Sequence, residues 1–533
     1  MGNAVSSSVL TMVKSNKENS LQARCCEPHK IGMSNLLDHA EFRKHGCQMV
    51  NLVVDYWENI GRRNVLSKVK PGYLASLIPQ EAPEDPEPWE TIMEDIERVI
   101  MPGVTHWQHP NFHAYFPTAA SYPSMCAEIL ANGFACMGFS WAANPACTEL
   151  EVVMMDWLAK MLHLPEEFLS GGNGGGVIQG SCSEATLVAL FGARNRTIEK
   201  YQKEHPGATI YEAASKLVGY YSDQAHSSVE RAGLISMIRL RKLRTGISRE
   251  LCATDLEEAI KEDIANGLLP FFCVTTLGTT GCCAFDNLKE IGPVCEQYDI
   301  WLHVDAAYAG AAFICPEFRP LLEGIEHAMS FVFNPHKWLL TNFDCTCMWY
   351  KNMDWIIKSF CVDPSYLKHT HQGRAPDFRH LHIPLGRKFR SLKLWFVMRR
   401  YGVYGLQQYI RNHVHLARHF KQLLLSDQRF EIVYKVTLGL VCFRIKNNNK
   451  LTQKLYEDIE ADGRIHLVSS EFHHPEEIYF IRFVICYPGA EEVHNIYAFQ
   501  VIKELTERLL PRQEGTHQDH PKIEQAQETV IPR

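Results

Sequence analysis

Six short apolar runs, most of them separated by longer helical patterns, constrain the fold of this 533-residue chain more than any other feature. Strands that alternate with helices predict a largely parallel sheet covered by helices, an α/β architecture. Because ligands of such sheets bind at the carboxyl ends of the strands, the residues just after each run are the candidates for chemistry. The runs lie at 176–179, 217–221, 270–276, 300–304, 329–333 and 345–350.

The regions on either side of this alternation predict separate parts. Apolar side chains at helical spacing over 38–62, and a second helical pattern at 89–99, predict an N-terminal helical arm. Strand candidates at 430–434, 438–445 and 479–485 predict a small C-terminal α+β domain. The expected division is a disordered tail (1–35), the arm (36–120), a large cofactor-binding domain (121–411), the small domain (412–510) and a second disordered tail (511–533).

Composition excludes several classes of function. The chain has 54 Lys and Arg against 61 Asp and Glu, a net charge of −7, so there is no electrostatic reason to bind nucleic acid. No apolar run is long enough to cross a bilayer, and no signal peptide opens the chain. The 18 cysteines are scattered without a CxxC pair, which favours reduced thiols in a cytoplasmic protein and no metal site.

Four segments that follow strand-like runs carry polar side chains. Each segment taken alone allows two interpretations. The turn at 180–183 opens a helix, which suits a phosphate or a plain N-cap by Ser181 or Ser183. His226 opens another helix and is by default a capping or surface residue. Asp305 ends a strand, and its carboxylate is either an N-cap or the partner of a cationic ring nitrogen. Lys337 is either a solvent-reaching lysine or a nucleophile toward carbonyls.

Together these segments indicate one cofactor. Pyridoxal phosphate requires a lysine that forms a Schiff base, a carboxylate that keeps the pyridine nitrogen protonated, and a phosphate-binding turn. Lys337, Asp305 and the helix start at 180–183 supply these three groups in the expected positions.

The motif Asn334–Trp338 (NPHKW) resembles the lysine motif of the group II pyridoxal-phosphate-dependent decarboxylases, and within them of the aromatic-amino-acid decarboxylases. The resemblance covers roughly residues 36–510 and is highly specific, because many long motifs occur in the same order. They include 112–122 (FHAYFPTAASY), 138–155, 175–188, 222–233, 276–287, 302–316 (LHVDAAYAGAAFICP) and 384–397.

The resemblance implies a fold-type-I homodimer with the active site at the subunit interface and the N-terminal arm packed on the partner. By motif, Lys337 is similar to the Schiff-base lysine, Asp305 to the pyridinium partner, His226 to the histidine stacked on the ring, and Tyr366 to a mobile-loop tyrosine that protonates the substrate carbon. The remaining positions match cofactor contacts (Cys182, Ser183, Thr280, Asn334, His336) and substrate contacts, some contributed by the partner subunit (Thr118, Trp107, Met137, Phe139, Gly386).

The implied activity is decarboxylation of aromatic L-amino acids, L-dopa and 5-hydroxytryptophan, to dopamine and serotonin. Gly386 stands where histidine-decarboxylase relatives carry Ser, which argues against histidine as substrate. One alternative is an aromatic acetaldehyde synthase, but relatives with that activity typically replace His226 by Asn or Tyr366 by Phe. The other is an inactive membrane-tethered scaffold, which the retained Lys337, Asp305 and His226 disfavour.

Ala120, Asn144 and the pair Leu381–His382 depart from the family's motifs without removing a chemical role, and two further departures carry predictions. Cys182 stands where Ala is usual, and its place at a helix N-terminus predicts a lowered thiol pKa and sensitivity to alkylation. The sequence from Met1 to Ser6 fits the N-myristoylation pattern, with Gly2 as the acceptor, or matches it by chance. One acyl chain binds membranes weakly, so the expectation is a cytoplasmic enzyme with a membrane-associated fraction.

Overall fold

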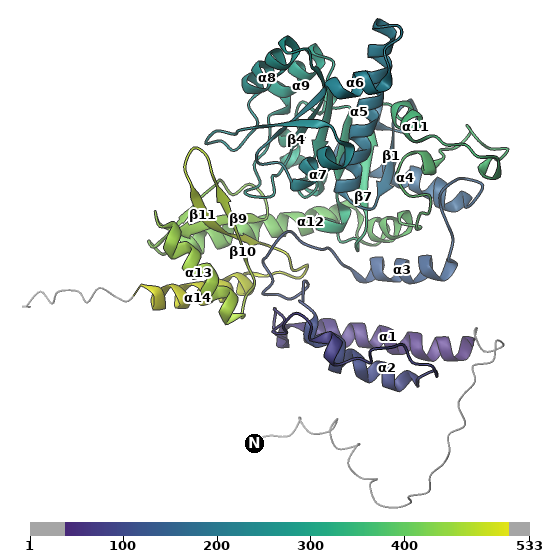
Figure 1. The fold of residues 1–533 in the computed structure, drawn as a ribbon. Coiled ribbons are helices and arrows are strands. Elements are labelled where there is room, and N and C mark those ends of the chain that lie inside the picture. Colours follow the sequence, from purple (N-terminus) through teal and green to yellow (C-terminus); the bar gives the residue numbers. More distant parts are fainter. Residues whose placement is uncertain (1–37, 511–533) are drawn as a thin grey trace, which may run out of the picture. The chain divides into compact units, whose positions relative to one another are not determined.

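The computed structural model describes residues 38–510, which form two compact units (Figure 1). One unit combines the segment up to Glu58 with Ser67–Val104, and the other combines Asn59–Leu66 with the chain from Thr105 onward. The helices of the described residues are α1 (His39–Asn59), α2 (Trp89–Asp95), α3 (Tyr122–Phe134), α4 (Pro145–Leu162), α5 (Cys182–Glu204), α6 (Ile210–Lys216), α7 (Ser227–Ser236), α8 (Ala253–Ala265), α9 (Leu288–Gln297), α10 (Pro335–Trp338), α11 (Asp354–Phe360), α12 (Ser391–Leu425), α13 (Asn449–Asp462) and α14 (Glu492–Leu509).

The first unit contains the two helices that the sequence predicts near the N-terminus. The ring of His45 on α1 stacks on Trp89, the first residue of α2, with centroids 4.2 Å apart, and Trp89 Nε1 donates to Gln48 Oε1 at 3.0 Å. Regular α-helix ends at Asp95, and the chain continues in a wider helical turn to Ile100, so the expected helix over 89–99 is present with a change of winding.

A seven-stranded sheet in the order β1-β7-β6-β5-β4-β2-β3 forms the centre of the second unit. Neighbouring strands are parallel except that β7 runs antiparallel to both β1 and β6, which confirms the largely parallel sheet. Its strands are β1 (Gly175–Gln179), β2 (Leu217–Ser222), β3 (Arg239–Leu243), β4 (Leu269–Thr276), β5 (Trp301–Asp305), β6 (Ser330–Phe333) and β7 (Thr346–Tyr350).

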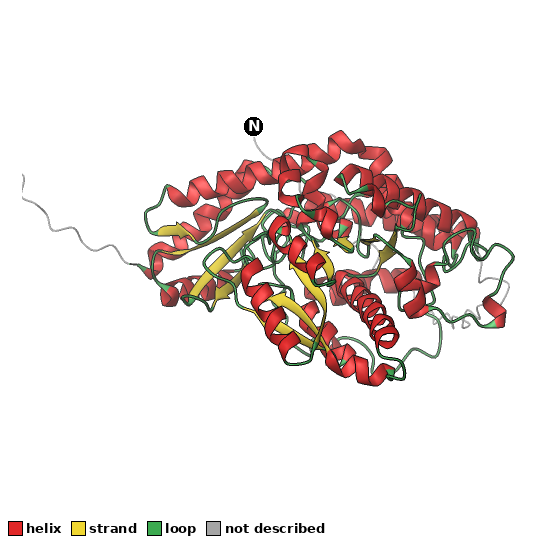
Figure 2. Ribbon diagram, turned by 90° about the horizontal axis from the view of Figure 1, so that it is seen from above, coloured by secondary structure: helices red, strands yellow, loops and turns green. Residues whose placement is uncertain are grey.

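Each face of this sheet buries a separate apolar core, because successive side chains of a strand point to opposite faces. On β5, Leu302 and Val304 join a core that includes residues of α4, α8 and α9. Trp301 joins the other core, with residues of α5, α7 and α11. Figure 2 shows the strands enclosed by helices. Both faces are therefore covered, which leaves the strand ends as the place for polar chemistry.

The small antiparallel sheet has the order β10-β11-β9-β8 and confirms the C-terminal α+β pattern. α12 is kinked at Gly402, whose φ of 64° and ψ of 172° are not helical. Before the kink it contributes Leu394 and Val397 to a core of the large sheet, and after it Phe420 and Leu424 to the core of the small sheet (Figure 1). The strands of the small sheet are β8 (Phe430–Ile432), β9 (Leu440–Ile445), β10 (Val468–Phe472) and β11 (Ile478–Val484).

Two strands were not expected from the sequence, β3 and β10, and both lie at the edge of a sheet. β3 reads Arg-Leu-Arg-Lys-Leu, and only Leu243 of it is buried. Charged side chains, lysine above all, protect an edge strand from pairing with another chain, and they also remove the apolar run that reveals a central strand.

Among residues 38–510, no helix is both long and apolar enough to cross a membrane. The same residues contain no group of three His, Cys, Asp or Glu side chains placed to hold a metal ion. The predicted acceptor of an acyl chain, Gly2, lies outside the described residues.

A buried ion pair joins α4 to the segment that precedes α12 and yields a test of the fold. Arg387 Nη2 lies 2.6 Å from Glu151 Oε1, and both side chains are 1% exposed. Glu151 Oε1 also accepts from the Ile178 N–H at 2.8 Å, while Arg387 Nη2 donates to the Ile178 carbonyl at 2.8 Å. Glu151→Ala leaves a buried guanidinium unpaired, so we expect urea unfolding to show a loss of about 3–5 kcal/mol.

The double variant Glu151→Leu/Arg387→Met removes both charges, and we expect it to recover most of the lost stability. If Glu151→Ala unfolds within about 1 kcal/mol of the wild-type protein, the pair does not have this role.

Candidate active site

A cavity of about 180 Å³ lies at the carboxyl ends of the central strands, where the sequence places the chemistry. It collects side chains from the segments that follow β1, β2, β4, β5 and β6. Seven predicted site residues meet here: Cys182, Ser183, His226, Thr280, Asp305, Asn334 and Lys337. The other lining residues are Phe116, Ser181, Thr276, Gly278, Ala307 and Tyr308.

One end of the cavity is the start of the 23-residue helix α5. Ser181 is the N-cap, and its Oγ accepts from the Glu184 N–H at 3.1 Å, so the capping interpretation is correct. The cap satisfies only one of the free N–H groups of the first turn, and Cys182 and Ser183 line the cavity beside it. Thr280 brings a hydroxyl from the segment after β4. Such a helix start is suited to hold a phosphate.

Asn334 is oriented toward the cavity by two neighbours. Its Oδ1 accepts from Thr346 Oγ1 at 2.7 Å and from Cys182 Sγ at 3.0 Å. The amide oxygen is therefore occupied, and the amide NH₂ group is left to donate to a ligand.

Asp305 and His226 are both placed by the backbone of the turn that follows a strand. Asp305 is buried at the end of β5, and its Oδ1 accepts from the Ala307 N–H at 2.9 Å. His226 is the N-cap of α7 at the mouth of the cavity, and its Nδ1 accepts from the Ser228 N–H at 3.2 Å. In the neutral ring, Nε2 therefore carries the proton. Partial burial lowers the pKa of His226, and the Lys337 cation acts in the same direction, against the opposing effect of Asp305.

Aromatic rings form the wall beside Lys337. The Nζ atom of Lys337, on α10, lies 5.6 Å from the centroid of the Phe116 ring. Phe116 stacks on Tyr308 with centroids 4.0 Å apart, and Tyr308 stacks on Trp338 at 4.6 Å. Sequence reasoning did not single out Phe116 or Tyr308. Both lie inside quoted motifs, but an aromatic residue beside a strand is more often part of the core than of a site.

His336 and Thr118 do not line this cavity, although both belong to segments that adjoin it. The Ala119 N–H donates to the His336 carbonyl at 2.7 Å, which attaches the segment after Phe116 to the lysine motif. His336 Nδ1 accepts from the Cys345 N–H at 2.9 Å, and burial lowers the pKa of His336 to about 3. His336 is therefore a neutral residue behind the lysine.

The predicted substrate contacts also lie outside the cavity of this single chain. Met137 is exposed, and a Cβ atom on Gly386 would approach Met137 Cε to 3.0 Å, so these two residues are neighbours. Phe139 is half-buried, and its carbonyl accepts from the Arg379 N–H at 3.0 Å. Trp107 stacks on Tyr115 at 5.1 Å. Their roles stay predictions.

Tyr366 lies in a short 3-10 turn within the segment that links α11 to α12, and 79% of its surface is exposed. It does not line the cavity of its own chain. The predicted role of its hydroxyl as a proton donor requires either movement of this segment or a second subunit.

The expected low pKa of Cys182 is wrong. Burial raises the pKa of this thiol well above its usual value, and the neighbouring Asp305 carboxylate acts in the same direction. The favourable helix N-terminus does not compensate for the loss of hydration. Cys182 is a hydrogen-bond donor to Asn334, and the predicted sensitivity to alkylation has no support here.

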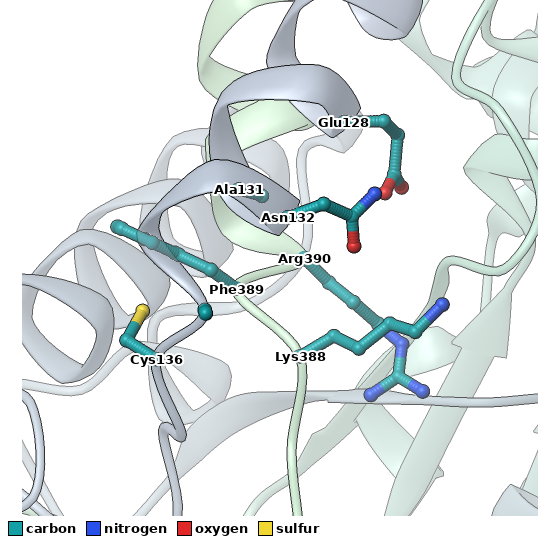
Figure 3. A pocket seen from close by; sticks show the side chains of 8 residues that line it. Glu128, Ala131, Asn132, Cys136, Lys388, Phe389 and Arg390 are labelled. Atoms are coloured by element: carbon teal, nitrogen blue, oxygen red, sulfur yellow. The ribbon is translucent and has the colours of Figure 1, made fainter. Parts of the chain in front are cut away.

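A second cavity, of about 260 Å³, lies between α3 with the turn after it and the segment 388–390 just before α12, and it contains none of the predicted site residues. Figure 3 shows Lys388 and Arg390 on one side and Glu128 and Asn132 of α3 on the other. Arg390 is already paired with Asp344, at 2.8 Å. Lys388 and Glu128 line this cavity, but its lining does not combine a lysine and a carboxylate with a phosphate-binding turn as the first cavity does.

The first cavity fits pyridoxal phosphate. Among the described residues, Thr276 Oγ1 in the cavity wall is buried without a hydrogen-bond partner, which leaves a polar atom for a ligand. Gly278 adopts a φ of +85°, and a Cβ there would lie 2.6 Å from Ala309 Cβ, so the turn over the cavity needs glycine. The donor set has a phosphate-binding helix start, a carboxylate and an amine. Fold and site together define a pyridoxal-phosphate enzyme of fold type I.

Comparisons with known proteins specify the family. Residues 71–446 match the pyridoxal-dependent decarboxylase conserved domain. The chain is 55% identical to an aromatic-L-amino-acid decarboxylase of Manduca sexta over 88% of its length and 92% of that protein.

Two solved structures are also similar to this chain. Tryptophan decarboxylase of Catharanthus roseus, in complex with L-tryptophan, has a TM-score of 0.83 at 39% identity and covers 89% of this chain and 100% of that one. The 4-hydroxyphenylacetaldehyde synthase of Rhodiola rosea has a TM-score of 0.82 at 37% identity, and the match covers 89% of this chain and 99% of that one. The chain belongs to the pyridoxal-dependent decarboxylase family, and its cofactor is pyridoxal phosphate.

His413 supports the lysine turn and yields a pH-dependent prediction. Its Nδ1 accepts from Trp338 Nε1 at 3.0 Å, and burial lowers the pKa of His413 to about 3. An unfolded histidine has a pKa near 6.5, so between pH 6.5 and about 3 the unfolded state binds one more proton. The free energy of unfolding should fall by about 1.4 kcal/mol per pH unit on acidification through this range because of this residue.

His413→Gln removes that contribution, so urea unfolding between pH 6.5 and 4 should depend on pH less steeply than in the wild-type protein. His415→Gln, an exposed histidine of the same helix, is the matched control for the loss of an imidazole. Parallel pH profiles of His413→Gln and wild type would show that His413 does not resist protonation.

Proposed function

We propose that the protein decarboxylates aromatic L-amino acids, L-dopa and 5-hydroxytryptophan, to dopamine and serotonin. The observation that carries this proposal is that one cavity gathers Lys337, Asp305 and His226, in a chain 55% identical over 88% of its length to an aromatic-L-amino-acid decarboxylase. Family membership gives the reaction class, and the identity of that relative supports the aromatic substrate.

Pyridoxal phosphate held in this cavity would supply an acceptor for the electrons that remain when the α-carboxylate of the substrate leaves as carbon dioxide. The first turn of α5 and the NH₂ group of Asn334 would bind its phosphate. The Asp305 carboxylate would hold a proton at the pyridine nitrogen. Lys337 Nζ would anchor the cofactor between turnovers and release the amine. His226 lines the cavity, and its ring would orient the substrate above the cofactor ring.

The Tyr366 hydroxyl would then donate a proton to the substrate Cα atom. Its exposure supports a segment that closes over an active site, where closure also excludes water. The residues from about 361 to 377 contain few buried side chains, as expected for a segment that moves.

We also propose a homodimer, with the N-terminal arm contributed to the partner and the domain boundaries expected above. Support comes from apolar surface on each unit taken by itself. In the first unit, α1 buries none of its side chains, and Phe42 is 74% exposed. In the second, Ile129 and Phe134 of α3 are 57% and 56% exposed. Exposed apolar surface of this kind commonly marks subunit contacts.

The competing activity is that of an aromatic acetaldehyde synthase, because one structural relative at 37% identity carries such a name. This chain retains His226 and Tyr366, which argues for simple decarboxylation. Purified protein incubated with dopa, 5-hydroxytryptophan, tyrosine, phenylalanine and histidine should release amine and carbon dioxide in equal amounts, with dopa and 5-hydroxytryptophan preferred. Aldehyde with hydrogen peroxide as the main products would contradict the proposal.

Tyr366→Phe tests the proton donor. Removing a positioned general acid commonly costs about 10²–10⁴-fold, so amine formation should fall by at least about 100-fold. Without the donor, the substrate carbon is open to dioxygen, and we expect aldehyde, ammonia and hydrogen peroxide to replace the amine.

The matched control is Tyr211→Phe, since Tyr211 is also 79% exposed but lies on α6. It should behave as wild type. If Tyr366→Phe yields only amine, at whatever rate, its hydroxyl is not the proton donor.

Gly386→Ser tests the substrate pocket. A side chain at this position would press on Met137, whose Cε atom would lie 3.0 Å from the new Cβ. We expect kcat/KM for dopa to fall about tenfold, and that for histidine to fall less. Gly386→Ala separates added volume from the added hydroxyl. Unchanged kcat/KM for dopa in both variants would place Gly386 outside the pocket.

For location, we propose a cytoplasmic enzyme with a membrane-associated fraction held by myristoylated Gly2. Because a single acyl chain gives marginal binding, only part of the protein should sediment with membranes, and Gly2→Ala should remove that part. Equal sedimentation of wild type and Gly2→Ala in fractionated cells would contradict acylation at Gly2.

A further inference from the structure

A buried hydrogen-bond chain links β5, β6 and α5 behind the cofactor cavity. Trp301 Nε1 donates to Ser330 Oγ at 2.8 Å, and Ser330 Oγ lies 2.9 Å from His303 Nδ1. His303 Nε2 lies 3.4 Å from Thr186 Oγ1 on α5. Ser330, His303 and Thr186 are each fully buried.

Trp301 Nε1 is the donor to Ser330 Oγ, because an indole nitrogen can only donate. The hydroxyl groups of Ser330 and Thr186 can each donate or accept. The neutral His303 ring, with one N–H and one bare nitrogen, therefore completes both bonds in either tautomer. Burial keeps the ring neutral, since it lowers the pKa of His303 to about 4.

The hydrogen-bond chain connects β5 to α5. These two elements carry the groups that would bind opposite ends of the cofactor, Asp305 at the end of β5 and the phosphate site at the start of α5. Thr186 lies four residues after Cys182, so it is one turn into α5 on the same face as the start of the phosphate site. His303 lies two residues before Asp305, so both side chains point to the same face of β5. The distance from Asp305 to the helix start must match the distance from ring nitrogen to phosphate.

We propose that His303 is a positioning residue, which clamps α5 to β5 through Thr186 and thereby sets the spacing between the phosphate site and Asp305. It touches neither cofactor nor substrate and acts through the residues that do. This inference rests on the proposed cofactor site and adds a determinant that its lining residues do not contain. A neutral imidazole suits the role, because its two ring nitrogens bond to β6 on one side and to α5 on the other.

Thr186→Val tests the clamp, because valine has nearly the shape of threonine but cannot form the hydrogen bond with His303. Loss of one buried hydrogen bond should raise the dissociation constant of pyridoxal phosphate about fivefold, measured by equilibrium dialysis. At saturating cofactor, the visible circular dichroism band should change in amplitude, because the ring is held in a different orientation. His303→Leu should show the same changes at larger size.

The matched control is Thr452→Val. Thr452 is also fully buried on a helix, and its Oγ1 accepts from the Ile445 N–H at 3.1 Å, but it belongs to α13 beside the small sheet. It should lose stability and keep wild-type cofactor affinity and dichroism. The proposal requires both changes in Thr186→Val and neither in Thr452→Val, and any other combination overturns it. A wild-type protein that binds no pyridoxal phosphate would contradict the proposed function instead.

Discussion

The common direction of β1, β2, β4, β5 and β6 is the constraint on which the rest of the structure depends. Together with β3 they are all the strands of the large sheet except the reversed β7, and the two faces of this sheet are covered by separate apolar cores. Unpaired charges and polar groups are costly inside such cores, so the side chains that do chemistry collect where the strands end. Asp305 ends β5, and Asn334 and Lys337 follow β6 within four residues.

The single reversed strand, β7, also contributes to the edge of the sheet where the site lies. Because β7 runs antiparallel to β1 and β6, its first residue, Thr346, lies at the edge where those strands end. Thr346 Oγ1 donates to Asn334 Oδ1 from there, and so orients the Asn334 amide. The buried chain from Ser330 through His303 to Thr186 reaches the same elements from behind the cavity. The site residues are therefore held by a second layer of buried hydrogen bonds.

Sequence alone predicts the central strands and the cofactor chemistry because both leave local signals. An apolar run marks a strand buried on two faces, and the side chains after it mark the site, so Lys337, Asp305 and His226 can be predicted from the sequence. The edge strands β3 and β10 give no such signal, since an edge strand is half polar.

Phe116 and Tyr308 were missed because aromatic packing against a lysine depends on tertiary contacts. The pKa of Cys182 was predicted in the wrong direction, because burial outweighs a helix N-terminus and burial cannot be read from neighbours in the sequence. Tyr366, Met137 and Gly386 stay predictions, because their roles depend on a closed segment or a second subunit.

The most direct measurement of the central claim is to find which side chain carries the cofactor. Borohydride fixes pyridoxal phosphate covalently to the amine that holds it, and peptide mass mapping then locates the added mass. We predict one modified peptide, containing Asn334–Trp338 and labelled on Lys337, with no label at any other lysine and none in Lys337→Ala. Label on a different lysine, or an unlabelled wild-type protein after incubation with excess cofactor, would contradict the assignment of this cavity as the active site.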